Sequence, residues 1–280
     1  MVTTKNTAAK STPASYINNP FYIASEGLGI WFAKARNVAL FLLIISGLIA
    51  TPSAINSHPS TPMQSGPPPT AIYGPATTSP FDPVLNVAFV VLPLLLLLAV
   101  VLLATAVNGI ASYAAAEASH ERSVSLKQAW RATRERFGNF FWLQVLTVTK
   151  VLLWSLLLIV PGVIMAVRYS LANIAFFDKK LSPGDALRES VALTDHSWIT
   201  TFSAQIFFNL ITLGIIEPLV TISAKTVLYR QLTTHREADK PAPDKLSKIT
   251  LAISIVLFIG IGVVTISLLT AGFNYLNTTV

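Results

Sequence analysis

Several stretches of this chain are apolar for about 18 to 20 consecutive residues, the length that a helix needs to cross a bilayer. The clearest contains "VVLPLLLLLAVVLLATAV", and another follows the last polar segment, at residues 249–273. Hydrophobic residues make up 52% of the 280 residues and charged residues 12%, about half the charged fraction of an average soluble domain. The sequence therefore predicts an all-α, polytopic transmembrane helical bundle.

The distribution of charge and the absence of cysteine each argue against certain classes of function. The formal net charge is +7, but the basic residues flank apolar runs and do not gather with aromatic residues on a soluble face. This distribution favours membrane lipids as partners and argues against a nucleic acid. The chain has no cysteine, so thiolate, disulfide and iron–sulfur chemistry are excluded, and no cofactor is expected.

Composition divides the chain into eight segments. We expect a disordered cytoplasmic tail (residues 1–20), an interfacial segment with the first span (21–50), a Pro/Ser/Thr-rich outer loop (51–83) and a second span (84–120). Two repeat units (121–178 and 179–232), a polar cytoplasmic linker (233–248) and a last span with an outer tail (249–280) follow. The apolar part of the first span, residues 35–50, is short, so we expect residues from Gly29 onward to extend it.

The two central units resemble each other at an offset of 57 positions, which pairs Pro161 with Pro218 and Ser125 with Ser182 without a gap. Each unit begins with a capping-box pattern, followed by a short amphipathic helix, a span that rises to the proline, and a shorter returning helix. The rising helices are expected at residues 140–160 and 198–216, and the returning helices at 162–177 and 219–229. These features predict two tandem repeats.

The prolines can be turns between two spans or kinks within one long span. A single kinked span would hold about 37 residues, or about 55 Å of helix, for about 30 Å of hydrocarbon. We therefore predict hairpin turns at Pro161, Gly162 and Pro218, which gives seven spans. With the N-terminus in the cytoplasm and the C-terminus outside, none of the outer loops contains Lys or Arg, as the positive-inside rule requires. This pattern predicts a multi-pass protein of the cell inner membrane.

Three cations remain inside apolar segments: Lys150, Arg168 and Lys225. Arg168 and Lys225 each lie seven residues after a repeat proline, and the spans offer almost no acid to neutralise them. The side chains can be structural, either reaching the headgroups or binding backbone carbonyls. Alternatively, the three cations line a shared cleft that holds an anion such as a lipid phosphate, or they belong to a transport pathway.

Basic residues also mark the short helix of each unit. In the first unit Lys127, Arg131 and Arg134 share one face, and Arg188 is the repeat equivalent of Arg131. A basic amphipathic helix is typical of a segment that lies on an anionic leaflet. We expect these four residues to contact the inner leaflet.

Residues 161–198 resemble a family of uncharacterised bacterial multispan membrane proteins related to the membrane domain attached to glycerophosphoryl diester phosphodiesterases. The matching residues are Pro161, Gly162, Arg168, Tyr169, Asp178, Leu181, Ser182, Pro183, Ala186, Leu187, Ser190, Leu193, Thr194 and Trp198. The resemblance is looser over 120–232 and implies a multispan helical fold. It does not imply phosphodiesterase activity, because no region of the sequence fits the soluble catalytic barrel.

No catalytic motif emerges from the sequence. The four histidines are scattered, and HExxH, GxSxG and P-loop patterns are absent. We therefore expect no enzyme, no metal site and no catalytic residue. The leading hypothesis is a membrane accessory or scaffold protein that engages anionic lipid or a membrane partner, and the alternative is a small permease for an anionic or lipid-like substrate.

Overall fold

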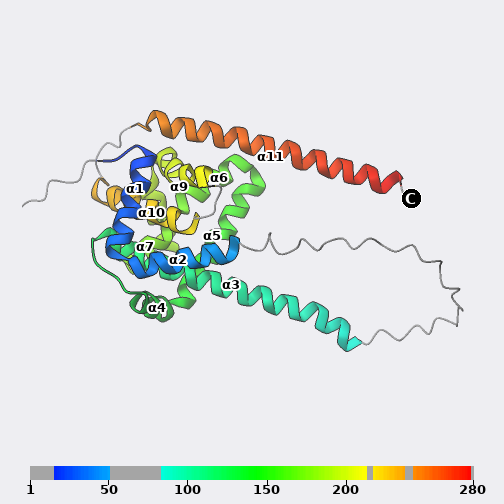
Figure 1. Cartoon of the computed structure of the whole chain (residues 1–280), viewed down its shortest axis with the longest axis horizontal. Coiled ribbons are helices and arrows are strands. Elements are labelled where there is room, and N and C mark those ends of the chain that lie inside the picture. The colour runs from blue at the N-terminus through cyan, green and yellow to red at the C-terminus, as the bar shows by residue number, and fades with distance from the viewer. Residues whose placement is uncertain (1–15, 51–82, 213–216, 237–241, 279–280) are drawn as a thin grey trace, which may run out of the picture.

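The computed structural model describes residues 16–50, 83–212, 217–236 and 242–278, and these residues form α-helices and no strands. Most of the helices pack into one bundle (Figure 1). Two long helices, α3 (Pro83–Ser119) and α11 (Lys245–Thr278), start or end in this bundle and extend well beyond it on the same side (Figure 1). The predicted all-α class is thus confirmed.

Four helical segments are long and apolar enough to cross a membrane by length and composition: Val91–Ser119, Phe137–Leu157, Ile159–Asp178 and Lys245–Ala271. The bent pair Pro20–Lys34 and Arg36–Ser46 gives a fifth candidate span if the two helices count as one broken span. The described residues therefore carry the helices of a membrane protein. They do not reach seven spans, so the seven-span topology stays a prediction.

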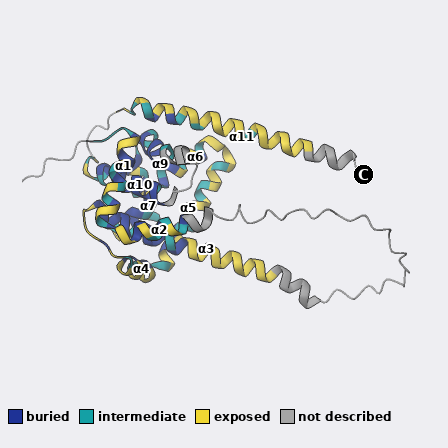
Figure 2. Cartoon of the chain, viewed as in Figure 1, coloured by how far each residue is buried: buried dark blue, intermediate teal, exposed yellow. Residues whose placement is uncertain are grey.

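The exposed surface of the long helices is strongly apolar. Exposed leucine, isoleucine, valine and phenylalanine side chains follow α3 from Val91 to Leu103 and α11 from Ile253 to Leu269, the yellow stretches of Figure 2. The neighbouring ends of α5 (Phe137–Leu157) and α6 (Ile159–Tyr169) are exposed in the same way. Soluble proteins rarely expose apolar patches of this size, so this surface fits contact with lipid.

The N-terminal part of the chain bends sharply. Asn19 caps α1 (Pro20–Lys34) by accepting a hydrogen bond from the Phe21 amide at 2.9 Å. After Ala35 the chain turns by 115° into α2 (Arg36–Ala50). Gly29 and the residues up to Lys34 belong to α1 and run in a different direction, so they extend the first span only if α1 and α2 form one broken span, and the extended span stays a prediction.

The centre of the bundle is α10 (Glu217–Thr234). Its side chains at a spacing of four residues are fully buried, among them Val220, Ala224 and Leu228. Helix α1 packs against it so closely that a Cβ on Gly27 would lie 2.6 Å from the Ser223 carbonyl carbon. In the same interface the Trp31 indole donates a hydrogen bond of 2.8 Å to the Thr226 hydroxyl.

The two predicted repeat units have a similar order of elements, but the returning helix expected at residues 162–177 is divided into two helices in the first unit. The first contains α4 (Leu126–Glu135), α5, α6 and α7 (Ala172–Asp178), and the second contains α8 (Pro183–Thr194), α9 (Trp198–Thr212) and α10. Both predicted caps are confirmed, since the hydroxyls of Ser125 and Ser182 each accept a backbone N–H three residues on, at 3.3 Å. The units also differ: α4 is largely exposed, whereas one face of α8 is fully buried. The repeat itself stays a prediction.

The first predicted turn lies three residues earlier than expected. Helix α5 ends at Leu157, Leu158 is extended, and Pro161 and Gly162 lie in the first turn of α6. Proline is tolerated there because the first amides of a helix have no intrahelical acceptor. Gly162 allows close packing, since a Cβ on it would lie 2.8 Å from the Cα of Ser155 in α5. Pro218 is the second residue of α10, and residues 213–216 before that helix lie outside the described part of the chain.

Candidate functional site

The three predicted intramembrane cations do not share one cleft. Arg168, in the last turn of α6, lines one pocket, and Lys225, in α10, lines another. Lys150 in α5 places its ammonium 5.9 Å from the centre of the Tyr169 ring, which borders the Lys225 pocket. The structure thus brings Lys150 near the pocket of Lys225 and directs Arg168 elsewhere.

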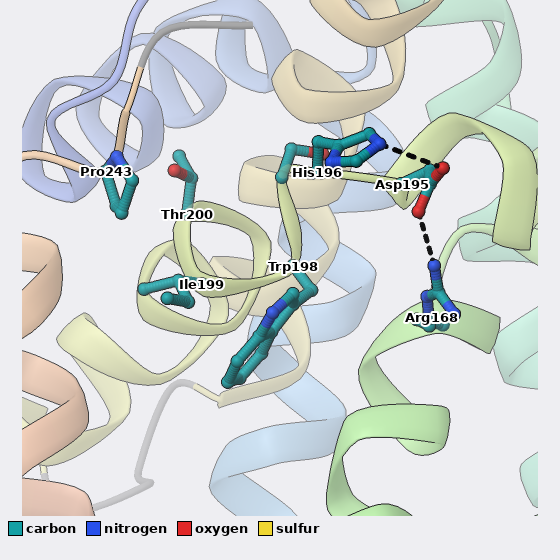
Figure 3. Close-up of a pocket in the computed structure, with 8 residues that line it drawn as sticks. Arg168, Asp195, His196, Trp198, Ile199, Thr200 and Pro243 are labelled. Atoms are coloured by element: carbon teal, nitrogen blue, oxygen red, sulfur yellow. Dashed lines mark hydrogen bonds and ion pairs between the residues drawn. The ribbon is translucent and has the colours of Figure 1, made fainter.

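The Arg168 pocket lies where four helices begin or end and has a volume of about 330 Å³ (Figure 3). Its lining comes from the end of α6, the turn between α8 and α9, the first turn of α9, and the segment before α11. The lining residues are Arg168, Asp195, His196, Ser197, Trp198, Ile199, Thr200 and Pro243.

The turn after α8 shapes this pocket. Helix α8 ends at Thr194, Asp195 is extended, and His196 adopts a left-handed conformation with φ of 58°. Two hydroxyls on the buried face of α8 hold the end of α6 in place, because Ser190 and Thr194 donate to the Arg168 carbonyl at 2.6 and 3.4 Å. This contact fixes the Arg168 backbone beside the turn that carries Asp195.

Arg168 has an acidic partner that the sequence did not indicate. Its Nη2 lies 2.6 Å from Asp195 Oδ1, as Figure 3 shows. The side chains are 28% and 51% exposed, so the pair contributes at most about 1 kcal/mol to folding. The acid that neutralises Arg168 comes from the turn after α8 and not from a candidate span. Asp178 is instead bound by the Tyr229 hydroxyl and the His120 ring, each at 2.6 Å.

Two donors in the pocket have no hydrogen-bond partner among the described residues: Arg168 Nε and Ser197 Oγ, both of which are buried. Ser197 as a whole is only 5% exposed. The amides of Trp198, Ile199 and Thr200 open α9, and the first amides of a helix have no intrahelical acceptor. Leaving a buried donor unsatisfied costs about 1 to 3 kcal/mol, and an anionic ligand is the group that satisfies such donors together.

The Lys225 pocket is a groove of about 360 Å³ between α5, α6, α7, α9 and α10. Val163, Val167 and Phe202 form apolar walls. The polar lining is linked by hydrogen bonds, with Gln205 donating to Ser170 at 3.0 Å. Helices α6 and α9 line both pockets. Sequence reasoning missed these polar residues, because single Gln and Ser residues in an apolar run give no signal of what they face.

The predicted inner-leaflet residues are exposed. On α4, Lys127, Arg131 and Arg134 face solvent while Ala129 and Thr133 are buried against the bundle. Arg131 also pairs with Glu135 along the helix at 3.1 Å. Arg188 lies on the exposed side of α8 and pairs with Asp185 at 3.3 Å. All four basic side chains are therefore accessible to a membrane surface.

Comparisons with known proteins add no assignment: no protein-family model matches the chain, and neither the curated proteins nor the solved structures contain a significant match. The resemblance of residues 161–198 to the phosphodiesterase-associated membrane domain therefore stays a prediction from the sequence. Function has to be argued from the geometry of the site.

Proposed function

We propose that this protein is a non-enzymatic accessory or scaffold protein of the membrane that binds a phospholipid by its headgroup phosphate in the Arg168 pocket. One observation carries the proposal: the buried Nε of Arg168 and the buried hydroxyl of Ser197 both lack a partner among the described residues and line the same pocket. Hydrogen bonds from an arginine to a phosphate are charge-assisted and stronger than neutral ones.

The position of the pocket favours a lipid as the source of the phosphate. Arg168 belongs to the candidate span Ile159–Asp178, and Pro243 lies two residues before the candidate span Lys245–Ala271. Trp198 opens α9 beside them, and tryptophan is enriched at the membrane–water interface. One side of the pocket therefore lies beside the start of a candidate span, where lipid headgroups are found. Arg168 reaches the pocket from the end of α6, midway along the candidate span Ile159–Asp178, where the helix breaks before α7.

Removing the Arg168 guanidinium is expected to reduce lipid retention about tenfold, since Arg168 is the only arginine among the described residues that line the pocket. The protein would be purified in mild detergent, and bound phospholipid would be counted by native mass spectrometry for wild type and Arg168→Gln. Arg122→Gln is the matched control, because Arg122 is 69% exposed and pairs with Glu117 away from the pocket. Equal retention by wild type and Arg168→Gln contradicts the proposal.

We further propose that the protein is an inner-membrane protein with its N-terminus in the cytoplasm, its C-terminus outside and the proline-rich segment outside. Because the chain has no cysteine, single cysteines can report this orientation directly. A membrane-impermeant maleimide added to intact cells is expected to label Ser65→Cys and Thr279→Cys. It should label Ser123→Cys, just before α4, only after the cells are opened. Labelling of Ser123→Cys in intact cells contradicts the orientation.

A further inference from the structure

The Arg168 pocket carries both signs of charge. The Arg168 guanidinium and the Asp195 carboxylate are 2.6 Å apart, so their formal charges cancel within the pocket. His196 Nε2 lies 3.4 Å from the other carboxylate oxygen and is itself 87% exposed. A headgroup with a net negative charge would meet the Asp195 carboxylate as soon as its phosphate reached Arg168.

We infer that the pocket selects a zwitterionic headgroup with a primary ammonium, that is, a phosphoethanolamine lipid. This inference rests on the proposed function and names its ligand class. The phosphate is bound by Arg168 Nε, the Ser197 hydroxyl and the first amides of α9. The ammonium group is bound by the carboxylate of Asp195, which is 51% exposed and accessible from the pocket.

The chemistry of the two headgroup ends separates this ligand from its competitors. A primary ammonium donates up to three hydrogen bonds and forms charge-assisted bonds with a carboxylate. The trimethylammonium group of phosphocholine has no N–H to donate. A phosphoglycerol headgroup has no positive charge that could pair with the Asp195 carboxylate. The pocket therefore favours phosphoethanolamine over both phosphocholine and phosphoglycerol.

The neighbouring groove explains why the ligand is a lipid and not a free headgroup. Helices α6 and α9 line the Arg168 pocket and also the Lys225 groove, where Val163, Val167 and Phe202 offer an apolar surface. An acyl chain attached to the headgroup can follow these two helices. Burial of acyl methylenes adds affinity in proportion to the apolar area removed from water.

The test uses the full-length protein in nanodiscs that contain equal amounts of phosphatidylethanolamine, phosphatidylglycerol and phosphatidylcholine. Native mass spectrometry of the protein released from the nanodiscs counts the lipids that stay bound. Wild type is expected to retain phosphatidylethanolamine about fivefold over each of the other two, the discrimination that a half-exposed ion pair supplies. Asp195→Asn should lose this preference, and Asp185→Asn, which changes an exposed acid of α8, should keep it.

The outcomes separate the inference from the proposed function. If wild type retains phosphatidylglycerol or phosphatidylcholine as well as phosphatidylethanolamine, or if Asp195→Asn keeps the preference, the inference is wrong while lipid binding stands. If Arg168→Gln retains as much of every lipid as wild type does, both the inference and the proposed function are wrong. Displacement of the lipid by millimolar glycerophosphoethanolamine would show that the acyl chains are not needed and would overturn the lipid as ligand. The thermal unfolding midpoint of each variant confirms that the compared proteins are folded.

Discussion

Replacing Gly27 by alanine is expected to lower the free energy of unfolding by about 1 to 3 kcal/mol, the range for an overpacked core. The added Cβ would lie 2.6 Å from the carbonyl carbon of Ser223 and in contact with its oxygen. Both groups belong to the backbone of α10, and this helix is held on its other sides by fully buried residues such as Val220 and Leu228. The helix cannot move aside without opening contacts elsewhere.

The matched control is Gly29→Ala on the same helix. Gly29 is exposed, and no atom lies within 4 Å of the position that its Cβ would take. Alanine has a higher helix propensity than glycine by about 1 kcal/mol, so this variant is expected to be as stable as wild type or more stable. Unfolding in detergent, followed by intrinsic tryptophan fluorescence, measures the stability of both variants. Equal losses in the two variants would show that α1 and α10 are not in close contact here.

Local features of the fold could be predicted because they depend on short stretches of sequence. The apolar length of α3 and α11 identifies them as candidate spans without knowledge of their neighbours. The caps at Ser125 and Ser182 follow from a hydroxyl followed three residues later by a polar side chain. The break in the first unit was placed within three residues of Leu158, although the pattern pointed to the proline and not to the residue that turns.

Contacts between distant residues could not be predicted in this way. Periodicity shows which face of a helix is apolar but does not say which helix packs against it, so the approach of Gly27 to Ser223 has no signal in the sequence. The pairing of Arg168 with Asp195 is of the same kind. Nothing in the sequence near Asp195 indicates this partner, and only the left-handed turn at His196 and the docking of α8 place Asp195 beside α6.

Arg136 illustrates a structural cation that the sequence did not distinguish. It lies between α4 and α5 among other basic residues, yet it donates to the carbonyls of Phe176 and Leu181, at 2.9 Å each. Its guanidinium also lies 4.1 Å from the centre of the Phe176 ring. Carbonyls after the end of a short helix such as α7 need partners, and this arginine supplies two at once. The number and position of basic residues in this segment give no sign of this role.

Replacing Glu189 by glutamine is expected to lower the free energy of unfolding at neutral pH by about 2 kcal/mol, because two charged donors lose their anionic acceptor. Glu189 lies on α8, and its side chain is only 14% exposed. It binds Lys179 after α7 at 2.7 Å and Arg236 after α10 at 2.8 and 3.2 Å. The carboxylate thus joins the middle of α8 to the residues that follow α7 and α10.

The stability that Glu189→Gln loses should depend on pH, in a direction set by the pKa of Glu189. Burial alone would raise the pKa of Glu189, but the hydrogen bond and charge of Lys179 together with Arg236 outweigh it and hold the pKa below its ordinary value of 4.5. A carboxyl group whose pKa is lower in the folded state contributes stability above its unfolded pKa and loses it as the pH falls through the folded pKa. The difference between wild type and Glu189→Gln is therefore expected to be full at pH 6 to 7, and to shrink when the pH falls below about 4.5.

Glu135→Gln provides the control with the same chemical change. Glu135 is 62% exposed and pairs along its own helix with Arg131, which is 84% exposed. Glu135→Gln should therefore lower the free energy of unfolding by less than about 0.5 kcal/mol. Unfolding of the three proteins would be measured in detergent between pH 3.5 and 7. A Glu189→Gln loss that is no larger than that of Glu135→Gln, or that grows on acidification, would mean that α8 is not held by this carboxylate. In that case the hydroxyls of Ser190 and Thr194 on α8, which bind the end of α6, would be the contacts that keep α8 in the bundle.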